Sequence, residues 1–339
     1  MGYSISKENF NEFLAEFSKQ YKIYAPKRYE NRGRFSDTDM IRYGEIKSIE
    51  EIEFNEKSNF SPKEIIFPIT QTILYFTEEQ WKESTVHEKG IIVFLRPCDI
   101  NGIDRLDGIF LQNGPFEDIY YKRLREKVKF VMIECRESYE NCFCVSMGSN
   151  FTENYSMAVR FGDEIKVDVK DVCFEEFIKT RAEQAEFKPE YVTVNDKNVK
   201  LPEVDKMPQE IYEHKMWDEY SRRCIACGRC NTMCVTCSCF TTTDITYEDN
   251  PKAGERRRVW AGCHIDKFTN MAGGHSFRKK NGQRMRFKSF HKIYDYKKRF
   301  GKHMCVGCGR CDDNCPEYIS FSESINKLTK TLKEEFSNE

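Results

Sequence analysis

Hydrophobic side chains recur at helical spacing near the start of the chain. The large apolar residues of segment 6–21 are Phe10, Phe13, Leu14, Phe17 and Tyr21. Most of them lie three or four positions apart, the interval that brings side chains onto one face of an α-helix. The pattern predicts an amphipathic helix whose apolar face packs on a core.

Two short apolar runs further along predict buried strands. They are GIIVFLRPCD at residues 90–99 and KFVMIECRE at residues 129–137, both rich in the residues that sheets favour. The segment between them is long enough for a crossover containing a helix, so we expect a βαβ unit with two parallel strands. Beyond it, residues 155–169 predict a hairpin that turns at Gly162-Asp163.

The organisation of the chain follows from these elements and from composition. Residues 186–210 are polar and contain three prolines, which is typical of a linker. We therefore predict an α+β protein with an N-terminal α/β domain over residues 1–205 and a second domain over residues 206–339. The length of 339 residues, with 39% hydrophobic and 14% aromatic residues, supports packed domains and excludes a disordered chain.

The sixteen cysteines are unusual for a chain of this length. The first seventeen residues lack the basic start and apolar core of a signal peptide, and no apolar run approaches the roughly 18 residues that span a membrane. We expect a cytoplasmic protein with no membrane partner. In that reducing compartment, clustered cysteines bind metal more often than they form disulfides.

Two cysteine runs carry the strongest chemical signal. The first, CIACGRCNTMCVTC, starts at Cys224, and the second, CVGCGRCDDNCP, starts at Cys305. Both follow the spacing C-x2-C-x2-C-x3-C, the ligand pattern of two-cluster ferredoxins. Three thiolates two residues apart can wrap one cubane if the backbone turns tightly, and the glycines at positions 228, 307 and 309 favour such turns.

The fourth cysteine of each run is expected to bind the cluster of the other run. It lies one helical turn beyond the third cysteine and cannot easily close the same cube, and two-cluster proteins cross their ligands in this way. We predict two 4Fe–4S clusters. One is held by Cys224, Cys227, Cys230 and Cys315. The other is held by Cys305, Cys308, Cys311 and Cys234.

Zinc is the alternative for these runs, but it prefers two separated pairs of ligands to two compact quartets. Val235 follows Cys234 where ferredoxins commonly have proline, so a register in which Cys237 or Cys239 replaces Cys234 is a second alternative. Cys263 is either a buried structural thiol or an extra ligand.

A third iron–sulfur site is suggested by four cysteines of the N-terminal half. They are Cys98, Cys135, Cys142 and Cys144. The first two are expected to end the predicted parallel strands, whose carboxyl ends meet at one edge of a sheet, where open α/β sheets bind ligands. Four buried or reactive thiols are the alternative, and the residues alone leave both open.

Apart from the predicted iron–sulfur clusters, the sequence has no motif for binding a substrate or a nucleotide. The chain has no G-x-G-x-x-G, no P-loop and no H-E-x-x-H. We predict that the chain belongs to an oxidoreductase complex, passes electrons between its partners and has no catalytic residues of its own.

A basic stretch lies between the cysteine runs. Residues 278–303 contain eleven Lys or Arg and one acidic residue, Asp295, with aromatic residues interleaved. We interpret it as a positive field that stabilises reduced clusters or docks an acidic partner. A solvated face and a nucleic-acid surface are the alternatives, and we expect no nucleic-acid partner.

Five stretches together resemble a known family. They are FLRPCDINGIDRLDGIF, ENCFC, CxxCGRCNxxCxTCxCF, AGGHSFR and CVGCGRCDDNCP, in that order along the chain. The chain resembles the iron–sulfur subunit of anaerobic sulfite reductase, and also the related β subunit of cytoplasmic hydrogenase/sulfur reductase complexes.

The resemblance implies an iron–sulfur electron-transfer role, which we expect first in an anaerobic sulfite reductase, with the hydrogenase/sulfur reductase complex as the alternative. In sulfite reductase, electrons would come from a subunit that holds FAD and oxidises NADH or NADPH, and would go to a sirohaem subunit that reduces sulfite to sulfide. In the alternative complex they would come from a NiFe subunit. The resemblance also implies the third cluster and a C-terminal α-helical ferredoxin domain.

Overall fold

The computed structural model describes residues 2–203, 205 and 207–336 and divides into two compact units. Unit 1 runs from the N-terminus to Phe67 and adds Thr85–Tyr139 and Gly148–Asn195. Unit 2 consists of Pro68–Ser84, Glu140–Met147 and the chain from Asp196 onward. The units therefore interleave along the chain, whereas the sequence analysis divided it once, after residue 205.

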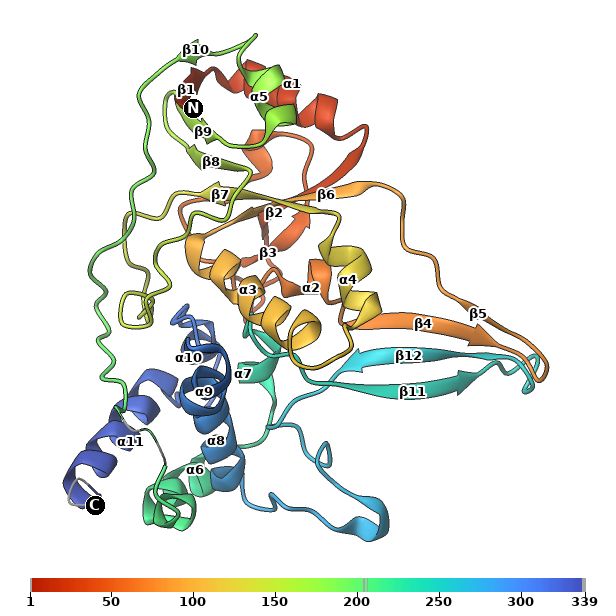
Figure 1. Ribbon diagram of the computed structural model, residues 1–339, viewed down its shortest axis with the longest axis vertical. Coiled ribbons are helices and arrows are strands. Elements are labelled where there is room, and N and C mark those ends of the chain that lie inside the picture. The colour runs from red at the N-terminus through yellow and green to blue at the C-terminus, as the bar shows by residue number, and fades with distance from the viewer. Residues whose placement is uncertain (1, 204, 206, 337–339) are drawn as a thin grey trace. The chain divides into compact units, whose positions relative to one another are not determined.

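Unit 1 is built on an eight-stranded mixed sheet of strand order β10-β1-β9-β8-β7-β6-β2-β3 (Figure 1). Its strands are β1 Gly2–Ile5, β2 Tyr21–Tyr29, β3 Met40–Glu45, β6 Gly90–Leu95, β7 Val128–Ile133, β8 Met157–Arg160, β9 Ile165–Val169 and β10 Glu183–Gln184. Its helices are α1 Lys7–Phe17, the short 3-10 helix η1 Ile49–Glu51, α2 Lys63–Ile66, α3 Pro97–Leu111, α4 Ile119–Arg125 and α5 Val172–Ile178.

The predicted elements of this half are present. The apolar runs form β6 and β7, which pair in parallel and are joined through α3 and α4. The hairpin is β8 and β9, which pair antiparallel. Helix α1 begins where the Ser6 hydroxyl accepts the backbone N–H of Asn9 (3.1 Å) and ends at Phe17, so Tyr21 opens β2 instead of closing the helix.

The core of unit 1 lies where α1 covers the sheet. Phe10, Phe13 and Leu14 are fully buried and belong to one cluster with Phe94 of β6. Strands β6 and β7 are buried along most of their length, which explains why they read as continuous apolar runs and not as alternating ones.

Unit 2 combines helices with a four-stranded antiparallel sheet of order β11-β12-β4-β5. The strands are β4 Thr70–Phe76, β5 Trp81–Glu83, β11 Phe240–Thr246 and β12 Gly254–Trp260. The helical elements are η2 Glu210–Glu213, η3 Lys215–Trp217, α6 Asp218–Arg223, α7 Arg229–Thr232, η4 Ala272–Gly274, α8 Asn281–Phe290, the π-helix η5 His291–Asp295, α9 Tyr296–Phe300, α10 Arg310–Asp313 and α11 Phe321–Glu335.

The sheet of unit 2 was not predicted, and it shows that this part of the chain is not purely helical. Strand β11 is mostly exposed, so it carries no apolar pattern, and β4 comes from a distant segment of the chain. The helical part has its own core, in which Trp217, Met285, Phe321 and Leu328 are buried. No helix among the residues that the structure describes is long and apolar enough to cross a membrane.

Candidate metal centres

The two cysteine runs fold into similar local structures in unit 2. Cys224 ends α6, and its sulfur accepts the backbone N–H of Ala226 (3.4 Å). In the second run, the sulfur of Cys305 accepts the backbone N–H of Gly307 (3.4 Å). The backbone then turns through a left-handed glycine, Gly228 or Gly309, that begins the short helix carrying the third cysteine. The repeated spacing therefore produces a repeated fold.

The second run is too crowded for side chains at its glycines. Gly307 has φ +63° and Gly309 has φ +71°, values that L-residues rarely adopt. A Cβ at Gly307 would lie 2.5 Å from the carbonyl carbon of Phe143, and one at Gly309 would lie 2.3 Å from the carbonyl oxygen of Asn141. Segment 140–147 thus packs tightly against the second run.

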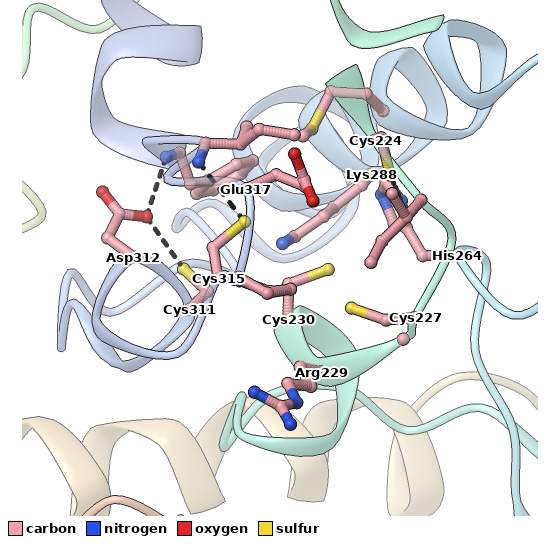
Figure 2. A pocket seen from close by; sticks show the side chains of 16 residues that line it. Cys224, Cys227, Arg229, Cys230, His264, Lys288, Cys311, Asp312, Cys315 and Glu317 are labelled. Carbon is pink, nitrogen blue, oxygen red and sulfur yellow. Dashed lines mark hydrogen bonds between the residues drawn. The ribbon is translucent and has the colours of Figure 1, made fainter. Parts of the chain in front are cut away.

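One pocket gathers the thiols of the first predicted cluster. Its cysteines are Cys224, Cys227, Cys230, Cys311 and Cys315. In Figure 2 the thiols of Cys227, Cys230 and Cys315 point toward one another, and the ammonium group of Lys288 lies among them. Cys315 comes from the second run, and the backbone N–H of Ile319 donates to its sulfur (3.3 Å).

The thiols of the second predicted cluster also lie within electrostatic range of one another. Burial raises the pKa of Cys305 to about 12, and the neighbouring Cys234 and Cys308 add to the rise. The pKa of Cys311 is raised by burial first, with further contributions from Cys305 and Cys234. Cys234, the last cysteine of the first run, thus lies within electrostatic range of Cys305 and Cys311, and Cys315 lines the pocket of the first run.

These sites suit iron–sulfur clusters better than single metal ions. Among the described residues, no three His, Cys, Asp or Glu side chains are arranged to hold one ion. In a cubane each thiolate binds a different iron, so the four sulfurs stand around a larger body. Burial raises the pKa of Cys224 and brings that of Cys230 to about 11, so these thiols must lose protons when metal binds. The crossed ligand assignment stays a prediction.

His264 is a neighbour of the first site that sequence reasoning missed. Its Nδ1 lies 3.8 Å from the sulfur of Cys224, and the residue is only 1% exposed. Its Nε2 is buried without a hydrogen-bond partner among the described residues. Burial, aided by Lys288 and Arg284, lowers the pKa of His264 to about 3. The imidazole is therefore neutral, and nothing in the sequence WAGCHID would have indicated its position.

Two cysteines outside the predicted ligand sets, Cys237 and Cys263, form hydrogen bonds with Asn231 of α7 in the first run. Its side-chain amide donates to the sulfurs of Cys237 (3.5 Å) and Cys263 (3.4 Å), both of which are buried. Its Oδ1 accepts the backbone N–H of His264 (3.2 Å). Cys239, which is partly exposed, directly precedes β11. These contacts fit a structural role for Cys237 and Cys263.

The cysteines of the predicted third site fall in both units. Cys98 lies in the first turn of α3, beyond the end of β6 at Leu95, and Cys135 lies two residues beyond the end of β7. Both belong to unit 1, and Arg96 lies 4.0 Å from the sulfur of Cys135. Cys142 and Cys144 belong to unit 2 and are buried there. The third cluster stays a prediction.

Comparisons with known proteins agree with a metal-binding role. Residues 223–319 match the 4Fe-4S dicluster domain family. The chain is 27% identical over 347 residues to the sulfhydrogenase 2 subunit beta of Pyrococcus furiosus, covering 97% of this chain and 98% of that protein. No solved structure shows a significant match. The chain is thus a homologue of a sulfhydrogenase β subunit and carries a region similar to two-cluster 4Fe–4S domains; no match points to sulfite reductase in particular.

Proposed function

We propose that this protein is the iron–sulfur electron-transfer subunit of a multisubunit oxidoreductase of the hydrogenase/sulfur reductase type. The observation that supports the proposal is that Cys315 of the second run lines one pocket with Cys224, Cys227 and Cys230 of the first. A crossed arrangement of this kind would make each run depend on both clusters and would keep the two clusters close together. Each bound cluster would supply reversible one-electron transfer.

The type of complex is inferred from the relative. Sulfite reductase headed our expectations from sequence, with the hydrogenase complex as the alternative. The similarity to a sulfhydrogenase subunit over nearly the whole length of both chains favours the alternative. We therefore propose that a NiFe subunit donates the electrons and that an FAD-containing, NAD(P)H-linked subunit is a further partner, and we place the complex in the cytoplasm.

The third cluster is part of the same proposal. Cys98, Cys135, Cys142 and Cys144 would hold it, and it would add a third carrier to the electron path. The first test is the content of iron and acid-labile sulfide per chain after purification without oxygen. About twelve irons would support three four-iron clusters, and about eight would leave only the two in the dicluster region. Zinc without sulfide would overturn the proposal.

A second test identifies the partner. The full-length chain is tagged in its native host and isolated with its complex under anaerobic conditions. Bound nickel with hydrogen-dependent reduction of the iron–sulfur signal would support the hydrogenase type. A sirohaem absorption band with sulfite-dependent oxidation would support sulfite reductase instead. Oxidation of NADH by the isolated chain, without any flavoprotein, would contradict a purely electron-carrying role.

A further inference from the structure

Two lysines of the basic stretch are buried in unit 2. Lys288 of α8 is 3% exposed and Lys292 of the π-helix η5 is 2% exposed. They lie four residues apart on a continuous helical stretch, so their side chains project in similar directions. Neither ammonium group pairs with a carboxylate among the residues that the structure describes.

Buried ammonium groups such as these need a nearby negative charge or strong hydrogen bonds. Removing an ammonium group from water costs several kcal/mol unless an anion or strong hydrogen bonds offset the loss. A nearby like charge adds to that cost. Arg284, a basic side chain of the same stretch, is paired with Asp266 (2.7 Å). Asp312 and Glu317 also line the pocket of Lys288, but neither forms an ion pair with it, so the thiol groups and what they hold are its nearest source of negative charge.

Lys288 faces both thiol groups. Its ammonium group lies in the first pocket among the cysteines of that site (Figure 2). Cys311, which is assigned to the second group, lines the same pocket, and Cys234 lies within electrostatic range. The position of Lys288 in the pocket lined by Cys224, Cys230 and Cys311 thus allows it to act on both thiol groups.

Lys292 is fixed beside the second group alone. Its Nζ donates to the hydroxyl of Thr236 (2.7 Å), which lies 3.3 Å from the sulfur of Cys234. Its backbone carbonyl accepts the N–H groups of Met304 (2.9 Å) and Cys305 (3.1 Å). The π-helical turn places this residue at the start of the second run, and such turns occur frequently at functional sites.

We infer that Lys288 and Lys292 are fixed positive charges that raise the reduction potentials of the two clusters, Lys288 acting on both and Lys292 chiefly on the cluster of the second run. One-electron reduction of a cluster, for example by dithionite, adds one negative charge and neither makes nor breaks a bond. A nearby cation stabilises the reduced form more than the oxidised one. This inference rests on the proposed two-cluster function.

The test compares Lys288→Gln and Lys292→Gln in the full-length chain, with Lys297→Gln, an exposed lysine of α9, as the matched control. Potentials are measured by redox titration with electron paramagnetic resonance, and each signal is assigned with the ligand variants Cys227→Ala and Cys308→Ala. Glutamine keeps a hydrogen-bond donor and removes the charge, on a shorter side chain.

The two substitutions are expected to lower the reduction potentials of the clusters in different ways. Lys288→Gln lowers both potentials and Lys292→Gln lowers only the second, each by a tenfold change in the oxidised-to-reduced ratio, which is about 59 mV for one electron. Lys297→Gln leaves both unchanged, and Lys288→Arg restores the values of the unaltered chain.

The outcomes separate the inference from the function on which it rests. Full iron content with unchanged potentials in both glutamine variants would overturn the inference and leave the two-cluster function standing. If a glutamine variant lacks iron, Lys→Met at the same position repeats the measurement. Loss of iron from both substitutions would also overturn the inference, because the lysine would then serve assembly. An unaltered chain without iron and sulfide would overturn the proposed function itself.

Discussion

Replacing Cys315 tests the crossed ligand assignment directly. Cys315 belongs to the second run by sequence, but the structure places it in the pocket with Cys224, Cys227 and Cys230. If it binds the cluster of the first run, Cys315→Ala damages that cluster and spares the one next to Cys308. An uncrossed arrangement predicts the opposite.

The magnitude follows from the number of thiols at each site. Each cubane contains four irons, so loss of one cluster removes about four of about eight irons in the dicluster region. The other thiol group, which includes Cys305 and Cys311, keeps all of its members. We therefore expect the dicluster region to keep about half of its iron, in one cluster, beside the iron of the proposed third cluster.

The assay is the spectrum of the cluster that survives. Electron paramagnetic resonance of the reduced Cys315→Ala chain should match that of Cys227→Ala and differ from that of Cys308→Ala. Cys173→Ala is the control, since Cys173 is exposed on α5 of unit 1, and it should retain both signals. A Cys315→Ala spectrum that matches Cys308→Ala would refute the crossed assignment.

Two further substitutions test the packing. Gly309→Ala forces an L-residue into φ +71° and puts its Cβ 2.3 Å from the carbonyl oxygen of Asn141. We therefore expect the free energy of unfolding to fall by about 1–3 kcal/mol and a chelator to remove iron faster. Gly114→Ala, in open space, should change neither quantity. Phe94→Ala empties a fully buried position of unit 1 and should lower the free energy of unfolding by about 3–5 kcal/mol in denaturant titrations, without altering the cluster spectra. Phe116→Ala, at an 88% exposed position, is its control, and equal losses from both would contradict the assigned core.

The elements that could be predicted are those whose signal is local. The helix over Lys7–Phe17 and the strands Gly90–Leu95 and Val128–Ile133 appear where their apolar patterns indicated, because periodicity along the chain reports which side chains face a core. Their ends were less accurate. Cys98 lies in α3 and not at the end of its strand, since the tight strand-to-helix connection leaves no pattern.

The sheet of unit 2 could not be predicted for a different reason. Its β4 and β12 pair across a long separation in the chain, and β11 is largely exposed. Without an apolar face, strand pairing leaves no periodic signal in the sequence. The same long-range pairing brings Pro68–Ser84 into unit 2.

The sequence alone determined the chemistry of this protein, and the tertiary structure decided its arrangement. Two runs of C-x2-C-x2-C-x3-C select iron–sulfur ligation because thiolate type and spacing are local properties. Which thiols converge, and that Lys288 and Lys292 are buried among them, depend on how α7, α8 and α10 pack. In the sequence these lysines are indistinguishable from the exposed ones beside them, because burial is a property of contacts between distant segments.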